Sequence, residues 1–177
     1  VLRPGISLGA PTMRAVSESF IDALAGLHAI EVEQSGLVTL GKPEGYLQRQ
    51  VEGWTARDDN SRVDEVGDMR RISAWLAANL PRRPARAAVV HNDFKYDNVV
   101  VAADDPSRIV AILDWELAAI GDPGADLGTV LAYWVQSDDD DALKLVPLGP
   151  TTLPGNLTRQ QLVTRYQERS GREVEDL

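Results

Sequence analysis

Two short segments of the chain carry a set of polar side chains that could together transfer a phosphoryl group. The first follows the pattern H-x-D-x-K-x-x-N and supplies His91, Asp93, Lys95 and Asn98; the second is an apolar run that ends in Asp114. Phosphoryl transfer from Mg-ATP uses a carboxylate that accepts the hydroxyl proton, oxygen ligands for magnesium and a cation near the transferring phosphate. The pattern therefore predicts Asp93 as the base, Lys95 as the cation, and Asn98 and Asp114 as the Mg²⁺ ligands.

The elements around these residues should bring them together. Segments 98–102 and 108–113 are β-prone and flank the turn-forming segment 104–107, which predicts a β-hairpin. Asn98 begins the first strand and Asp114 follows the second. A hairpin would therefore place the two predicted metal ligands side by side, although 16 positions separate them in the sequence.

Each of these residues also has a plainer explanation when it is taken alone. Asp and Asn commonly end turns and cap helices, and Lys95 could be an ordinary surface lysine. His91 is predicted to be a buried, hydrogen-bonded anchor of the loop, because no serine or second histidine is placed to form a hydrolytic triad with it. His28 is interpreted as structural, at a helix end where a cation would suit the dipole.

The remaining pattern is mostly helical and predicts a single α+β domain over residues 1–177. Apolar residues at three- and four-residue steps predict helices at 13–30, 43–57, 62–79 and 125–136. Thr158 and Gln161 form a capping box for a last helix that ends near residue 170. The two methionines and four tryptophans are expected mostly in the core.

Composition excludes several classes of function. The net charge is −9, from 27 acidic and 18 basic residues without a basic cluster, which argues against a nucleic-acid partner. The chain has no cysteine, so it forms no disulfide, and this fits a cytoplasmic protein. No apolar run reaches the roughly 18 residues of a membrane span.

Two further motifs are set aside. Segment 36–42 matches G-x-x-x-x-G-K, but Pro43 stands where a phosphate loop needs Ser or Thr, and a helix precedes the segment instead of a strand. The acidic run 138–141 is interpreted as a solvated loop and not as a metal cluster. Glu116 and Asp122 are close enough in sequence to Asp114 to contact a substrate, but neither is assigned a role.

Residues 20–135 resemble the C-terminal lobe of aminoglycoside phosphotransferase-like enzymes. The resemblance rests on segments 27–28, 45–50, 91–98 and 112–128. The last of these is most similar to the subgroup associated with acyl-CoA dehydrogenases. The resemblance implies a protein-kinase-like C-terminal lobe, mostly α-helical with a small central β-hairpin.

The same resemblance implies roles for individual residues. Asp93 would be the catalytic Asp, Asn98 and Asp114 the Mg²⁺ ligands, and Asp126 the residue that hydrogen-bonds the backbone of the catalytic loop. Lys95 matches the lysine of protein kinases in this loop. The implied reaction is ATP-dependent phosphorylation of a small-molecule hydroxyl, on a hydroxyacyl-CoA or an aminoglycoside-like acceptor.

One departure from the family pattern is large. The family carries an N-terminal lobe with a phosphate-contacting lysine, and nothing in this sequence matches it. We therefore expect a fragment that is inactive alone, has that lobe as its partner, and exposes apolar surface that could drive self-association. A non-catalytic kinase-like binding module and a metal-dependent phosphohydrolase remain alternative functions.

Overall fold

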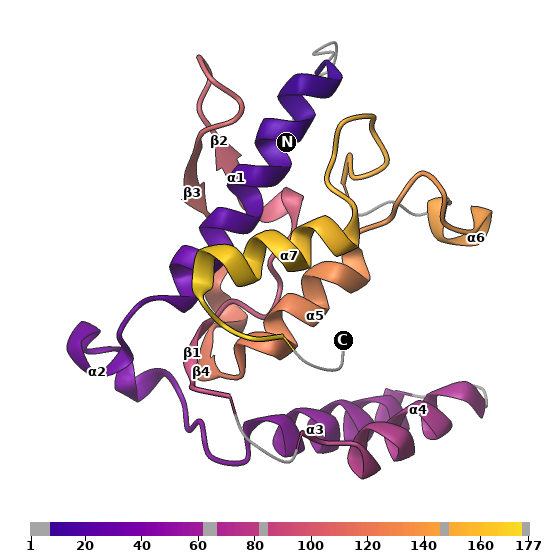
Figure 1. Ribbon diagram of the computed structural model, residues 1–177. Helices are drawn as coiled ribbons and strands as arrows, with labels where there is room; N and C mark the ends of the chain where they lie inside the picture. The colour runs from indigo at the N-terminus through magenta and orange to yellow at the C-terminus, as the bar shows by residue number, and fades with distance from the viewer. Residues whose placement is uncertain (1–7, 62–66, 82–84, 146–148, 175–177) are drawn as a thin grey trace.

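Helix α1 (Ala10–His28) supplies much of the hydrophobic core of the computed structural model (Figure 1). The structure describes residues 8–61, 67–81, 85–145 and 149–174. The apolar stripe of α1 includes Phe20, Ile21 and Leu24, all fully buried. Helix α7 (Arg159–Ser170) lies against it, as do parts of the β-strands. The predicted helix 13–30 is confirmed, with its start moved to Ala10 because Pro11 fits the first helical turn.

Aromatic rings fasten the predicted catalytic loop to this core. Phe94 and Tyr96 come from the loop, and their ring centroids lie 4.6 Å and 4.8 Å from that of Phe20 on α1. Trp134, directly after helix α5 (Pro123–Tyr133), completes the cluster at 4.9 Å from Tyr96. Buried aromatic packing therefore holds this loop against α1 and against the end of α5.

Two small antiparallel sheets frame the loop. Strand β1 (Ala88–Val90) pairs with β4 (Ala119–Gly121), and β2 (Val99–Val101) pairs with β3 (Ile109–Ile112). The predicted hairpin is thus confirmed, and so is the α+β, mostly helical class. Strand β4 was not predicted, because it is only three residues long and lies in a run without alternating polarity.

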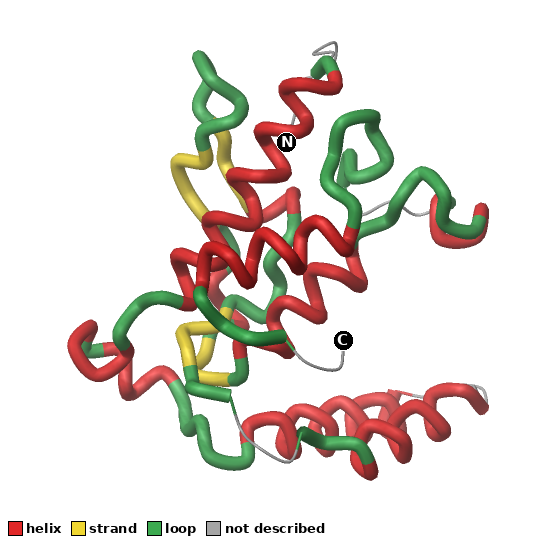
Figure 2. Tube along the Cα trace, in the orientation of Figure 1, coloured by secondary structure: helices red, strands yellow, loops and turns green. Residues whose placement is uncertain are grey.

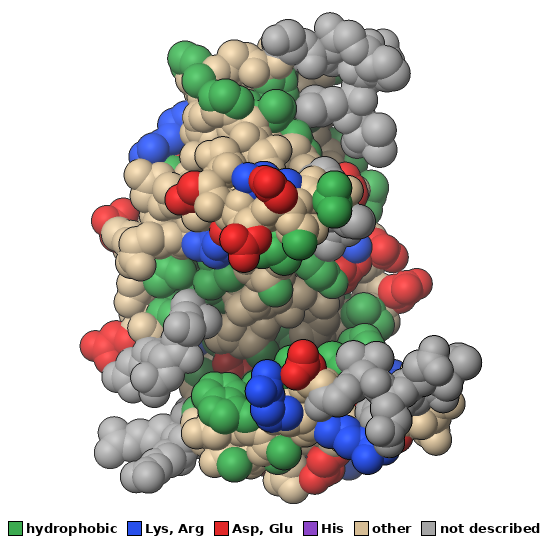
Figure 3. All heavy atoms as spheres, turned by 90° about the vertical axis from the view of Figure 1, so that its right-hand side faces the viewer, with side chains coloured by type: hydrophobic (Ala, Val, Ile, Leu, Met, Phe, Trp, Pro, Cys, Tyr) green, Lys and Arg blue, Asp and Glu red, His purple; other side chains and the backbone are tan. Residues whose placement is uncertain are grey.

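Helices α3 (Tyr46–Ser61) and α4 (Gly67–Ala78) lie side by side, set apart from the helices around α1 (Figures 1 and 2). Hydrophobic side chains reach the surface of this pair among charged ones, at the bottom of Figure 3. Trp54 is 60% exposed and Trp75 is 62% exposed. Each helix has an apolar face that the described part of the chain leaves uncovered.

The expectation that the tryptophans and methionines are core residues was therefore mostly wrong. Only Trp134 and Met13 are buried; Trp54, Trp75, Trp115 and Met69 are exposed. Helical periodicity identifies an apolar face but does not say what covers it. Residues 62–66, which open the predicted helix 62–79, lie outside the described residues.

Several short helical turns lie outside the helices that the sequence predicted. They are α2 (Val32–Ser35), the 3₁₀ turns η1 (Leu37–Leu40), η2 (Tyr96–Asn98) and η3 (Trp115–Leu117), and α6 (Asp141–Lys144). Segment 36–42 thus forms a 3₁₀ turn after a helix. In the acidic run, Asp139 pairs with Arg159 and Asp141 with Lys144. No described helix combines the length and apolar character needed to cross a membrane.

The capping box at the start of α7 should contribute measurably to stability. Thr158 Oγ1 accepts a hydrogen bond from Gln161 N at 3.2 Å, and Gln161 Oε1 accepts one from Thr158 N at 3.0 Å. We expect Thr158→Ala to lower the free energy of unfolding by about 1 kcal/mol in urea denaturation. Thr164→Ala, on the exposed face of the same helix, should change it by less than about 0.5 kcal/mol. Equal losses in the two variants would argue against the cap.

Candidate active site

His91 joins the loop after β1 to the segment that carries Asp114. Its side chain is fully buried, and its Nε2 lies 2.8 Å from the carbonyl oxygen of Leu113. Because a carbonyl only accepts, Nε2 carries the proton, which leaves Nδ1 to accept from the backbone N–H of Asp93 at 3.3 Å. His91 therefore has the geometry of the predicted loop anchor.

Asn92 turns the chain toward the site. Its φ of 65° lies in the left-handed region, which Asn adopts more readily than most residues. Its side chain accepts a hydrogen bond from the Tyr46 hydroxyl at 2.7 Å and donates one to the carbonyl of Leu117 at 2.8 Å. Tyr46 packs directly on Gly121, where a Cβ would lie 2.5 Å from its ring. Sequence patterns had not indicated Tyr46 or Asn92.

Asp93, the predicted base, is held by two neighbours from its own loop. Lys95 Nζ donates to its two carboxylate oxygens at 2.9 Å and 2.7 Å. Asn98 Nδ2 donates to its Oδ2 at 3.0 Å and to its backbone oxygen at 2.9 Å. The hydrogen bond to Asp93 raises the pKa of Lys95, so the lysine stays cationic. Asp93 and Lys95 therefore form an ion pair, with 2.7 Å between Lys95 Nζ and Asp93 Oδ2.

Tyr133 also borders this ion pair, although sequence reasoning missed it. Its ring centroid lies 5.5 Å from Lys95 Nζ, within the range of a cation–π contact. Burial raises the pKa of the Tyr133 phenol, and the nearby Asp93 carboxylate adds to the shift. The sequence could not indicate this contact, because it depends on how the end of α5 packs against the loop.

The two predicted metal ligands lie at adjacent ends of the hairpin. Leu113 N donates to Asn98 O at 2.8 Å, and the neighbouring pair in the ladder is Val99 with Ile112. The Asn98 amide nitrogen is committed to Asp93, which leaves its amide oxygen for another partner. Asp114 is exposed and has a φ of 68°. An amide oxygen beside an exposed carboxylate suits Mg²⁺, which prefers oxygen ligands.

Asp126, in the first turn of α5, is fully buried beneath the loop. Its Oδ2 accepts from the backbone N–H of His91 at 2.7 Å, and its Oδ1 accepts from that of Asn92 at 2.9 Å. The bond to the loop backbone that the family resemblance implies is therefore present. Asp122 caps the same helix and accepts from Gly124 N at 2.8 Å.

His28 also contacts Asp126, from the end of α1. His28 Nε2 lies 3.1 Å from Asp126 Oδ2, and Nδ1 lies 2.7 Å from the hydroxyl of Tyr166 on α7. These hydrogen bonds agree with the predicted structural role of His28. The helix dipole, which was the reason given for that role, does not account for them. These partners are 98 and 138 residues away, so no local pattern could have indicated them.

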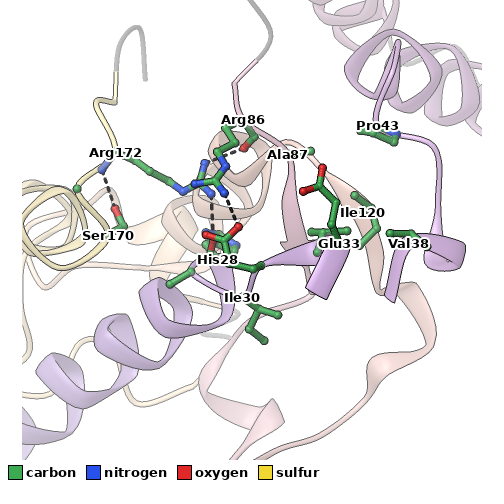
Figure 4. A pocket seen from close by; sticks show the side chains of 14 residues that line it. His28, Ile30, Glu33, Val38, Pro43, Arg86, Ala87, Ile120, Ser170 and Arg172 are labelled. Carbon is green, nitrogen blue, oxygen red and sulfur yellow. Dashed lines mark hydrogen bonds and ion pairs between the residues drawn. The ribbon is translucent and has the colours of Figure 1, made fainter. Parts of the chain in front are cut away.

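A pocket of about 670 Å³ lies away from the loop, where the ends of α1 and α7 meet the start of β1 (Figure 4). Arg172 donates to the backbone oxygen of His28 at 2.9 Å and to that of Arg86 at 2.7 Å. Arg86 is in turn ion-paired with Glu31. The arginines here fasten the end of α7 to the core, and none of the predicted site residues lines this pocket.

Comparison with known proteins identifies the family and the fold. Residues 3–148 match the model of the phosphotransferase enzyme family. The chain belongs to this family. Among its relatives is the rat (Rattus norvegicus) protein acyl-CoA dehydrogenase family member 11, which is 36% identical over 132 residues. That match covers 74% of this chain and 16% of the relative.

Relatives of this chain also include proteins named for antibiotics. Viomycin phosphotransferase of Streptomyces vinaceus is 28% identical over 175 residues, covering 91% of this chain and 58% of that enzyme. A crystal structure from Ralstonia eutropha, assigned as an aminoglycoside phosphotransferase, superposes with a TM-score of 0.81 at 27% identity. It is matched over 98% of this chain and 51% of its own, so this chain spans about half of that fold. The predicted kinase-like fold is thereby confirmed.

Proposed function

We propose that this phosphotransferase transfers the terminal phosphoryl group of Mg-ATP to a hydroxyl group of a small molecule. Family membership gives phosphotransfer as the class of reaction. The observation that supports the finer proposal is the geometry around Asp93, which Lys95 and Asn98 hold in place beside the hairpin end that carries Asp114.

In this proposal Asp93 orients the acceptor hydroxyl and takes its proton. Hydrogen bonds from Lys95 and Asn98 fix the carboxylate, so it need not reorganise when the acceptor binds. Lys95 Nζ lies within 3 Å of both carboxylate oxygens, so its charge is next to the position of the attacking oxygen. There it would neutralise charge that develops on the transferring phosphoryl group.

Asn98 and Asp114 would hold Mg²⁺ through the amide oxygen and the carboxylate. The ion supplies positive charge that screens the phosphates and orients them. The protein contributes the rigidity of the site, because the Leu113–Asn98 backbone bond fixes the spacing of the two ligands.

Two acceptor classes are supported by different relatives. The similarity to acyl-CoA dehydrogenase family member 11 favours a hydroxyacyl-CoA. The similarity to the Ralstonia eutropha structure assigned as an aminoglycoside phosphotransferase favours an aminoglycoside-like, cationic acceptor, which the net charge of −9 would also suit. We propose the first as the main candidate, because identity to that relative is higher.

The apolar surface on the hairpin side supports a partner for this chain. Val110, Leu113, Trp115 and Leu117 are each between 43% and 52% exposed, and they flank Asp114. We propose that an N-terminal lobe covers this face and completes the nucleotide site, and that self-association covers it when that lobe is absent. Activity is therefore best measured on the protein at the full length that its gene encodes.

Removing one metal ligand should weaken the response to Mg²⁺. We expect Asp114→Asn to raise the Mg²⁺ concentration for half-maximal phosphotransfer by at least about 10-fold. Loss of even an outer-shell partner of a metal ion typically lowers the metal affinity by about 10- to 100-fold. A Mg²⁺ titration at saturating ATP measures this effect. Glu116→Gln, which removes an exposed carboxylate two residues away, is the matched control and should leave the titration unchanged. Equal shifts in both variants would contradict the ligand assignment.

A further inference from the structure

A buried chain of hydrogen bonds connects the last described helix to the catalytic loop. It runs from the Tyr166 hydroxyl on α7 through His28 on α1 to Asp126 on α5, over distances of 2.7 Å and 3.1 Å. Relative exposures of Tyr166, His28 and Asp126 are 1%, 1% and 0%. Asp126 in turn accepts the two backbone N–H groups that begin the loop.

Chemistry fixes the direction of each bond. The Asp126 carboxylate can only accept, so the proton of a neutral His28 must be on Nε2. Nδ1 of the same ring then has a lone pair and accepts from the Tyr166 hydroxyl. Burial raises the pKa of the Tyr166 phenol to about 12, so the hydroxyl keeps the proton that it donates.

We propose that Tyr166 is a positioning residue of the active site, whose hydroxyl fixes the His28 ring so that its Nε2–H stays directed at the Asp126 carboxylate beneath the loop. Without the hydroxyl, the buried Nδ1 has no donor, and the ring loses the shorter of the two hydrogen bonds that orient it toward Asp126. This inference rests on the proposed function, since the loop is the one that carries Asp93.

Other contacts keep α7 in place when the hydroxyl is removed. Arg165 donates to both carboxylate oxygens of Asp22 on α1 at 2.7 Å and 2.8 Å. Arg172 donates to the backbone oxygen of His28, as Figure 4 shows. Tyr166→Phe should therefore remove the hydrogen bond to His28 Nδ1 without detaching the helix.

Nitrogen NMR of the histidine rings tests the proposal directly, because the chain has only two histidines. In the wild type, His28 should show a protonated Nε2 and an unprotonated Nδ1. In Tyr166→Phe the proton should stay on Nε2, while the Nδ1 resonance should shift to that of a nitrogen that accepts no hydrogen bond. Ser17→Ala is the control: it removes a fully buried hydroxyl on α1 that donates to the backbone oxygen of Arg14 at 2.9 Å, and it should leave His28 unchanged.

Hydrogen exchange supplies a second readout. The N–H groups of His91 and Asn92, which donate to Asp126, should exchange roughly 5- to 10-fold faster in Tyr166→Phe than in the control, the equivalent of one neutral hydrogen bond. Turnover should fall by a similar factor with the KM for ATP unchanged.

Three outcomes decide the matter. A His28 whose Nδ1 resonance is unchanged in Tyr166→Phe, with both amides exchanging as in the control, would overturn the proposal and leave Tyr166 a packing residue. A doubly protonated His28 in the wild type would also overturn it, because Tyr166 would then accept. If both spectroscopic changes occur in a protein that transfers no phosphate, the positioning chain stands and the proposed function fails.

Discussion

Replacing Asp93 by Asn should lower the rate of phosphotransfer by about 10²- to 10⁴-fold, the usual contribution of a positioned general base. Asparagine keeps the shape of the side chain but cannot take the acceptor's proton. Its amide would also direct N–H groups toward the Lys95 ammonium or the Asn98 amide, each of which now donates to Asp93. Initial rates at saturating Mg-ATP and acceptor measure the loss.

Asp97→Asn is the matched control for this substitution. Asp97 lies in the same loop, in η2, but its side chain is exposed. The same chemical change there should alter the rate by less than about two-fold, as expected for a surface site. Near-UV circular dichroism should show native packing in both variants. An Asp93→Asn protein that transfers phosphate at the wild-type rate would refute the assignment of the base.

The second large effect concerns stability. Asp126→Ala should lower the free energy of unfolding by about 3–5 kcal/mol, the usual cost of removing one partner from a buried charged cluster. The change leaves the backbone N–H groups of His91 and Asn92 and the ring of His28 without their acceptor, and all three lie in or beside the buried core. Urea denaturation measures the loss.

Asp122→Ala provides the comparison for this prediction. It removes the N-cap of the same helix, where the carboxylate accepts a single backbone N–H, and should cost only about 1 kcal/mol. If the two variants lose the same amount, the Asp126 carboxylate has no special role beneath the loop. A larger loss in Asp126→Ala supports the view that it fixes the loop backbone.

The arrangement around Asp93 could be predicted because its parts are close in sequence. Lys95 and Asn98 reach Asp93 from within the same loop, and the hairpin that brings Asp114 to Asn98 has a short turn. Local propensity and alternating polarity are enough to indicate such elements. The capping box of α7 was also predictable, since both of its partners lie within four residues.

Features that depend on distant contacts could not be predicted in this way. The pairing of β4 with β1, the hydrogen bond of Tyr46 to Asn92 and the contact of Tyr166 with His28 join segments that are many residues apart. Periodicity likewise indicated apolar faces on α3 and α4 without showing that Trp54 and Trp75 are exposed. The sequence therefore indicated the contacts within the loop around Asp93 better than the distant contacts that support this loop.

The most direct test of the central claim follows the terminal phosphoryl group of labelled ATP in the presence of Mg²⁺ and candidate hydroxyl acceptors. Hydroxyacyl-CoA thioesters and aminoglycosides are the first acceptors to try, with the protein at the length its gene encodes. We predict that the label appears on an acceptor hydroxyl and that turnover rises when the acceptor is added. Label released as free phosphate at a rate independent of any acceptor would contradict the account and indicate a phosphohydrolase, and ATP binding without movement of the label would indicate a binding module.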